Sequence, residues 1–264
     1  MNNFYNSLAN DKKLSIIAGP CVFENQELAV EIAETLKEIC DDLSVNFCFK
    51  MSFDKANRTS SSSYRGDFDG AYYAFDSIRN RGIPTLTDVH ESWQCSVTNA
   101  DILQIPAFLC RQTDLLKSAA ETGKPVNVKK GQFLSPWETK NIVDKIKSFG
   151  YNEVMLTERG TTFGYNNLVV DMRSLEVMKE YAPVIMDCTH AVQYPGGQGG
   201  SSGGDRRFAS VIAYAATAVS IAGLFMEVHP DPDNAPSDGP NMIKLKDFPK
   251  IIEQILEIDG VVKK

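Results

Sequence analysis

The sequence lacks several features that would point to particular classes of protein. It has no run of basic residues, and 27 Lys and Arg against 34 Asp and Glu give a net charge of -7, which argues against nucleic-acid binding as the main activity. Its six cysteines show no close pairing pattern, which favours a reducing cytosol over a disulfide-stabilised fold. The first residues, MNNFYNSLANDKKLSII, lack the order of a secretory signal. We therefore expect a cytoplasmic protein.

Long apolar runs are also scarce, and only residues 211–228 are apolar enough to be mistaken for a membrane span. Gly223 interrupts this stretch and Glu227 lies near its end. The pattern therefore predicts a buried helix, a turn and a strand, with no association with a membrane. No composition break or long linker divides the chain, so we expect one domain over residues 1–264.

Eight short apolar runs alternate with helical patterns along the chain. The runs are β-branched and mostly apolar on both faces, which is typical of parallel strands covered by helices. They occupy residues 14–19, 45–49, 85–89, 102–106, 126–129, 153–158, 184–189 and 223–227. The helical patterns occupy residues 24–39, 70–81, 92–100, 113–122, 135–150, 170–181, 206–222 and 244–260.

Each strand run ends at or near a polar or charged side chain, such as Lys50, Lys129 or Arg159. A hydrophobic strand has no packing reason to end in this way. A (β/α)₈ barrel supplies a reason, because its active site is built from side chains at the C-terminal ends of the strands. The alternative, a doubly wound open sheet, would not place functional residues on all eight strands. The sequence therefore predicts an α/β protein with a single (β/α)₈ TIM barrel.

Two long irregular segments follow strand runs on the side where barrel loops contact substrate. Residues 54–69 follow the second run, and residues 193–205 follow the seventh. The glycines of the second segment do not match a dinucleotide-binding fingerprint, because a third glycine is missing and no strand leads directly into it. We expect both segments to act as lids that exclude water, although the serines at 60–63 alone are typical of a flexible surface loop.

Four side chains at the ends of the first, seventh and eighth runs form a candidate metal site. Closure of the barrel makes these strands neighbours, so residues far apart in sequence are expected to meet. A mixed sulfur, nitrogen and oxygen set suits a divalent transition ion such as Fe²⁺, Zn²⁺ or Mn²⁺. Cys188 stays open as a fifth candidate, since strand alternation places it on the same face as His190. The four predicted ligands are Cys21, His190, Glu227 and Asp238.

A second candidate set is cationic. Several cations at one barrel mouth would repel one another unless anions neutralise them, and phosphate and carboxylate groups are the natural partners. This set comprises Lys50, Lys55, Arg58, Arg111, Lys129 and Arg159. By contrast, Lys130, Arg206 and Arg207 are interpreted as solvated or interface charges.

Several motifs together resemble the KDO 8-phosphate synthase family over nearly the whole chain. They are I-A-G-P-C (17–21), F-K-M-S-F-D-K-A-N-R-T-S (49–60), T-D-V-H-E (87–91), Q-I-P-A-F-L-C-R-Q-T-D-L (104–115), N-V-K-K-G-Q-F (127–133), E-R-G-T-T-F-G-Y-N-N-L-V-V-D-M (158–172) and H-P-D-P-D-N-A-P-S-D-G-P (229–240). The resemblance implies a condensation of phosphoenolpyruvate with D-arabinose 5-phosphate and water. It also implies a homotetramer, and Cys21 resembles the metal-dependent class of the family rather than the class with Asn at this position.

The resemblance also implies roles for individual residues. It assigns the phosphoenolpyruvate site to Lys50, Lys55, Lys129, Gln132 and Arg159. It assigns the phosphate of the aldose to Asn57 and Arg58, followed by Thr59 where the family usually has Ser. Asp88 and Arg111 complete the predicted substrate-binding set, and His190, Lys129 and Asp238 are expected to be catalytic. Cys110 stands where Ala is commoner, in a segment that lies near a subunit interface in the family.

Two other functions compete with this prediction. A DAHP synthase would use another aldose phosphate, such as erythrose 4-phosphate, but the K-A-N-R sequence at 55–58 counts against it. A catalytically inert phosphosugar-binding barrel would show gaps in the motif set, and every position checked is filled.

Overall fold

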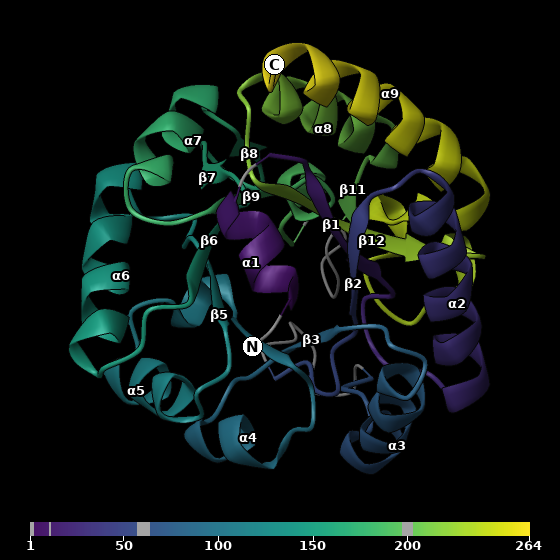
Figure 1. Cartoon of the computed structure of the whole chain (residues 1–264), viewed down its shortest axis with the longest axis horizontal. Coiled ribbons are helices and arrows are strands. Elements are labelled where there is room, and N and C mark those ends of the chain that lie inside the picture. The colour runs from purple at the N-terminus through teal and green to yellow at the C-terminus, as the bar shows by residue number, and fades with distance from the viewer. Residues whose placement is uncertain (1–2, 11, 57–63, 197–202) are drawn as a thin grey trace.

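The computed structural model describes residues 3–10, 12–56, 64–196 and 203–264. Eight parallel strands pair in the order β1-β2-β3-β4-β5-β6-β9-β12, and β12 pairs back to β1. The sheet is therefore closed, which confirms the (β/α)₈ barrel and excludes the open sheet (Figure 1). The strands are β1 (Ser15–Gly19), β2 (Asn46–Lys50), β3 (Thr85–Asp88), β4 (Ile102–Ile105), β5 (Val126–Lys129), β6 (Val154–Glu158), β9 (Val184–Asp187) and β12 (Gly223–His229).

Helices form a ring outside the strands, and each of the eight predicted helices is present (Figure 1). Their local signals are as expected: Asn25 caps α2 by accepting a hydrogen bond from the Leu28 amide, and Ser135 and Glu138 form a capping box before α6. The ring comprises α2 (Gln26–Asp42), α3 (Phe68–Arg79), α4 (Ser92–Val97), α5 (Thr113–Glu121), α6 (Thr139–Ser148), α7 (Met172–Lys179), α8 (Ala209–Ala218) and α9 (Phe248–Val262).

A further helix, α1 (Asn3–Asn10), was not predicted. It lies across the N-terminal end of the barrel (Figure 1). Phe4 and Leu8 pack there against interior residues such as Ile17 and Leu86. Phe4 and Leu8 are one helical turn apart, so they share a face. A single pair of this kind is a weak signal in a segment of eight residues, and the barrel end supplies the surface that makes the helix stable.

The apolar stretch at 211–228 is divided between α8, a turn and β12, as predicted. Among the described residues, the structure contains no helix with the length and apolar character that crossing a membrane requires.

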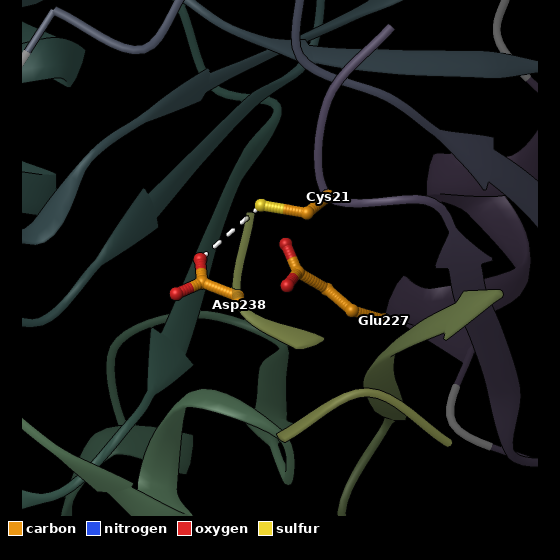
Figure 2. Close-up of side chains that lie close together, drawn as sticks. All are labelled: Cys21, Glu227 and Asp238. Atoms are coloured by element: carbon orange, nitrogen blue, oxygen red, sulfur yellow. Dashed lines mark hydrogen bonds between the residues drawn. The ribbon is translucent and has the colours of Figure 1, made fainter. Parts of the chain in front are cut away.

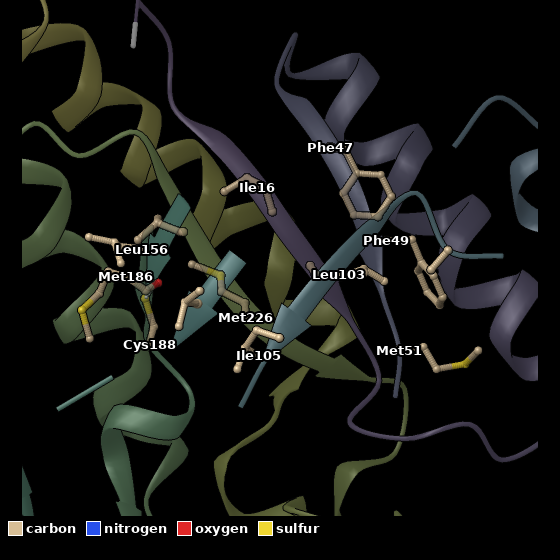
Figure 3. Packing of buried hydrophobic residues seen from close by; sticks show 14 of the residues in the cluster. Ile16, Phe47, Phe49, Met51, Leu103, Ile105, Leu156, Met186, Cys188 and Met226 are labelled. Atoms are coloured by element: carbon tan, nitrogen blue, oxygen red, sulfur yellow. Dashed lines mark hydrogen bonds between the residues drawn. The ribbon is translucent and has the colours of Figure 1, made fainter. Parts of the chain in front are cut away.

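Strand alternation separates two buried layers. Outward side chains such as Ile16, Phe49 and Met186 pack with the helices (Figure 3). Inward side chains at the N-terminal end, such as Cys48 and Ile102, pack under α1. Toward the C-terminal end the inward positions become polar, so the chemistry lies at that end.

Short strands lie at the C-terminal end of the barrel. The hairpin β7 (Thr161–Thr162) with β8 (Leu168–Val169) follows β6, and β13 (Ile243–Lys244) extends the sheet beside β12. The flanks of the predicted second lid pair as β10 (Gln193–Tyr194) and β11 (Gly203–Gly204). The centres of both predicted lids, 57–63 and 197–202, lie outside the described residues.

Candidate active site

The C-terminal end of the barrel opens into a cavity of about 820 Å³. Side chains from β3 and β5 and from the segments after β2, β4, β6, β9 and β12 line it, as expected for a barrel active site. Its ionisable lining includes Lys55, Asp88, His90, Lys129, Arg159, His190, Asp205, Arg206, Arg207, Asp233 and Asp238. Most of the strand-end residues singled out in the sequence therefore converge on one space.

Three side chains form the candidate metal centre at the wall of this cavity. The ligand atoms of Cys21, Glu227 and Asp238 all lie within 4.8 Å of one another. Cys21 lies just beyond β1, Glu227 lies on β12, and Asp238 lies in the loop that follows β12. Their side chains point toward one another, and the Sγ atom of Cys21 lies 3.2 Å from Oδ2 of Asp238 (Figure 2).

His190, the fourth predicted ligand, lies beside this group of three, on the 3₁₀ helix that follows β9. Its Nε2 atom lies 3.6 Å from Oε1 of Glu227 and 4.0 Å from Oδ2 of Asp238. Its Nδ1 atom lies 2.6 Å from Oδ2 of Asp187. This contact with Asp187 turns Nε2 toward the carboxylates of Glu227 and Asp238, the orientation in which the imidazole could bind a metal beside them.

The charges around this cluster set its protonation. Burial raises the pKa of the Cys21 thiol well above its usual value, and the negative charge of Glu227 raises it further. Burial alone would raise the pKa of Glu227 as well, but Lys50 and His190 outweigh it and hold that pKa at about 2. These surroundings therefore disfavour ionisation of the Cys21 thiol and favour ionisation of Glu227.

The donor set fits a divalent transition ion. The Oε2 atom of Glu227 is buried and has no hydrogen-bond partner within the described part of the chain, so one acceptor faces the cluster unused. A sulfur, an imidazole nitrogen and carboxylate oxygens from residues that meet only in the fold are the donors such ions take.

Another side of the cavity, formed by Arg159, has the features of an anion-binding site. Arg159, just after β6, donates from Nη2 to Oε1 of Gln193 at 2.9 Å. Its Nη1 is buried without a hydrogen-bond partner among the residues that the structure describes. Burial lowers the pKa of Arg159, while Asp187 and Glu158 act in the opposite direction. A buried guanidinium with a free donor indicates a carboxylate or phosphate ligand.

Lys129 lies between the anion side and the metal cluster. Its Nζ atom lies 2.7 Å from Oδ2 of Asp187, 3.3 Å from Nδ1 of His190 and 4.1 Å from the centre of the Phe225 ring. Burial would raise the pKa of Asp187, but His190 and Lys129 hold it far below its usual value. Asp187 therefore fixes two predicted catalytic side chains at once.

Lys50 lies beneath the cavity rather than on its wall. It is 1% exposed, and Nζ donates to the Cys21 carbonyl at 2.9 Å and to Oε1 of Glu227 at 3.0 Å. Lys55 does line the cavity, and its Nζ lies 3.9 Å from Oδ2 of Asp88. Burial would raise the pKa of Asp88, but Lys50 and Lys55 hold it well below its usual value.

The remaining predicted substrate residues are placed as follows. Gln132 lines the cavity, and its Oε1 is buried without a partner in the described segments. Arg111 is exposed and does not line the cavity that the described residues form. Asn57, Arg58 and Thr59 lie outside the described residues, so their roles stay predictions.

Three interpretations of the sequence are wrong. Arg206, interpreted as a solvated or interface charge, is partly buried in the cavity lining, where its Nη2 donates to Oδ1 of Asp233 and to the Gly239 carbonyl. Lys130 is 0% exposed rather than solvated, because its Nζ donates to the carbonyls of Gly131 and Leu134 and lies 3.5 Å from Oε1 of Glu158. Cys188 does not share a face with His190. Cys188 packs outward with Met186, two residues before it, as strand alternation requires (Figure 3). The chain turns into a 3₁₀ helix at His190–Val192, and this turn brings His190 to the cavity instead.

Sequence reasoning missed two residues of the site. Asp187 was overlooked because the neighbouring Cys188 and His190 were taken as the candidates. Its place at the end of an apolar run was a signal that could have identified it. Gln193 had no such signal. It joins the two halves of the site, since its Oε1 accepts from Arg159 and its Nε2 donates to Oδ1 of Asp238 at 3.0 Å.

Comparison with known proteins gives a consistent picture. A family model described as the DAHP synthetase I family matches residues 6–264. A protein of Chelativorans sp. (strain BNC1) named 2-dehydro-3-deoxyphosphooctonate aldolase is 56% identical over 260 residues, covering 97% of this chain and 94% of that protein. Proteins with the same name from Agrobacterium fabrum and Caulobacter vibrioides are 54% and 53% identical, over 97% of this chain and 93% and 91% of theirs.

Proposed function

The chain belongs to the DAHP synthetase I family, and on that premise we propose that it condenses phosphoenolpyruvate with D-arabinose 5-phosphate and water. The products are 3-deoxy-D-manno-octulosonate 8-phosphate and inorganic phosphate, a step toward the KDO of lipopolysaccharide. Two observations support this choice within the family: the name 2-dehydro-3-deoxyphosphooctonate aldolase of the similar proteins, and the K-A-N-R sequence at 55–58.

One observation carries the proposal: the cavity joins an anion site to a metal-type donor set. Lys129 and Arg159 face the same space as Asp238 and His190. Phosphoenolpyruvate brings a phosphate and a carboxylate, and an aldose phosphate brings an aldehyde. A site that holds the anions on one wall and the reacting carbonyl near the other matches this pair of substrates.

In the reaction, carbon 3 of phosphoenolpyruvate attacks the aldehyde carbon while water adds at carbon 2. The tetrahedral intermediate then loses phosphate by cleavage of the bond between carbon 2 and the phosphate oxygen. Lys129, Arg159 and Lys55 balance the charges of phosphoenolpyruvate in a pocket where preorganised donors are most effective. Gln132 and Asp88 complete the wall around this substrate.

Proton transfer is assigned to the least buried of the three carboxylates that contact His190. The side chain of Asp238 is 15% exposed, against 1% for Glu227 and 0% for Asp187. Asp238 also has a left-handed backbone with φ of 55°, a strained state of the kind found at functional sites. We assign Asp238 to accept the proton of the added water. We assign His190 to stabilise the alkoxide that forms from the aldehyde oxygen.

Cys21, His190, Glu227 and Asp238 would hold the divalent ion. When bound, Fe²⁺, Zn²⁺ or Mn²⁺ would supply Lewis-acid polarisation of the aldehyde oxygen or of water.

The proposal also includes a cytoplasmic location and a homotetrameric assembly. Sedimentation of the purified protein tests the oligomeric state.

The test is turnover of the purified protein with phosphoenolpyruvate and either D-arabinose 5-phosphate or erythrose 4-phosphate. We expect phosphate release and an eight-carbon product, identified by mass spectrometry, with the pentose phosphate. Faster turnover of erythrose 4-phosphate would favour the DAHP synthase alternative. Absence of turnover of either sugar, with metal supplied and the fold intact, would favour an inert binding barrel.

A further inference from the structure

A line of buried polar side chains crosses the interior of the barrel just beneath the cavity. Strand register places Asp88 beside Gln104, and Gln104 beside Asn127, on β3, β4 and β5. Thr157 on β6 continues the line. Gln104, Asn127 and Thr157 are each 0% exposed. Barrel interiors are usually filled with branched apolar residues, so three neutral polar residues in one layer need an explanation.

The line is a chain of hydrogen bonds with one direction. Nε2 of Gln104 donates to Oδ1 of Asp88 at 2.6 Å, because an ionised carboxylate can only accept. The Gln104 Oε1 therefore accepts from Nδ2 of Asn127 at 2.8 Å. The Asn127 Oδ1 in turn accepts from Oγ1 of Thr157 at 2.8 Å. All three donors point toward the same charge, an arrangement in which each bond strengthens the next.

The other oxygen of Asp88 is held from the opposite side. Its Oδ2 accepts from Oγ of Ser52 and lies 3.8 Å from Nζ of Lys50 and 3.9 Å from Nζ of Lys55. Asp88 and Lys55 line the cavity, whereas Gln104, Asn127 and Thr157 do not. Asp88 is therefore the member of the hydrogen-bonded chain that reaches the cavity.

We propose that Gln104, Asn127 and Thr157 are positioning residues that orient the Asp88 carboxylate, which in turn places the Lys55 ammonium for phosphoenolpyruvate. This inference rests on the proposed function, because phosphoenolpyruvate is the ligand assigned to Lys55. None of the three lines the cavity. Their contribution to phosphoenolpyruvate binding therefore passes along the chain of hydrogen bonds and is not a sum of separate contacts with the substrate.

A double-mutant cycle on phosphoenolpyruvate binding tests the coupling. The variants are Gln104→Leu, Thr157→Val and the double variant, with calorimetric Kd for phosphoenolpyruvate and melting temperature measured for each. Thr87→Val is the matched control: Thr87 is buried on β3, and its hydroxyl has no hydrogen-bond partner in the described part of the structure.

Loss of the bond to a charged group should weaken binding about tenfold in Gln104→Leu. Thr157→Val should weaken it about threefold, as expected for a neutral bond farther along the chain. In the double variant Kd should match that of Gln104→Leu, because Thr157 has lost its route to Asp88. KM for arabinose 5-phosphate should change little throughout.

Additive effects in the double variant, or equal Kd in Thr157→Val and Thr87→Val, would overturn the inference while leaving the proposed function intact. A wild-type protein that does not bind phosphoenolpyruvate overturns both. If Gln104→Leu does not fold, Gln104→Met takes its place in the cycle, and the comparison of Thr157→Val with Thr87→Val still decides.

Discussion

The Nδ1 atom of His190 lies 2.6 Å from Oδ2 of Asp187, which is fully buried at the end of β9. The same oxygen lies 2.7 Å from Nζ of Lys129. One carboxylate thus contacts both a candidate metal ligand, His190, and a candidate substrate-binding residue, Lys129. The metal side and the anion side of the site consequently depend on a single buried residue.

Asp187→Asn should impair both halves of the site. The amide removes the charge that holds Lys129, and its NH₂ group can face Nδ1 and reverse the histidine tautomer. Loss of such a partner typically costs about 10–100-fold in metal affinity or activity. Metal content and kcat/KM should both fall, whereas Asp144→Asn, in an exposed pair with Lys140, should leave both unchanged. Normal metal content in Asp187→Asn would show that this carboxylate does not orient His190.

Arg159→Lys should lower kcat/KM for phosphoenolpyruvate with the fold intact. Lysine keeps the charge but loses the planar fork, and with it both the bond to Gln193 and the free Nη1 donor. We expect a loss of about ten- to a hundredfold. Arg173→Lys, at a surface arginine paired with Asp171, is the control. Near-normal kinetics in Arg159→Lys would remove this residue from the anion site.

A chelator should abolish activity, and added Mn²⁺, Fe²⁺ or Zn²⁺ should restore part of it. Cys21→Asn should bind metal far more weakly, because it removes the softest donor of the set. Cys188→Ala should keep its metal content, since that thiol packs outward. Elemental analysis measures the metal in each protein. Full turnover by wild-type protein proven free of metal would contradict the metal-dependent mechanism.

Arg58→Ala should raise KM for arabinose 5-phosphate while KM for phosphoenolpyruvate changes little. This prediction rests on the sequence alone, because Arg58 lies outside the described residues. Loss of a charge-assisted contact of about 1.5–3 kcal/mol corresponds to roughly ten- to a hundredfold. Steady-state kinetics with each substrate varied in turn measure the effect, and equal increases for both substrates would refute the assignment.

Lys130→Ala should destabilise the fold. It leaves the buried carboxylate of Glu158 without its cation, and removing one partner of a buried pair costs about 3–5 kcal/mol. The melting temperature should fall by about 2–4 °C for each kcal/mol in a chain of this size. Lys140→Ala, in an exposed pair, should change it little. Similar melting temperatures for the two variants would argue against a structural role for Lys130.

The sequence by itself determined the barrel and much of the site. The alternation of strand and helix patterns is local, and polar ends such as Lys129, Arg159 and Glu227 are visible without any knowledge of contacts. The tertiary structure alone decided which neighbouring residues face the cavity. Strand alternation applies only while a strand continues. Cys188 lies outward like Met186, but the turn after β9 brought His190 to the cavity.

Closure of the barrel determined the other contacts of the site and its surroundings. It placed Lys130 against Glu158, joined Arg159 to Asp238 through Gln193, and aligned Gln104 with Asn127 beneath the site. It also supplied the apolar surface that stabilises α1. These contacts join residues far apart in the chain, and their register depends on how the strands pair around the barrel. No local pattern records that register, because it arises from the packing of all eight strands together.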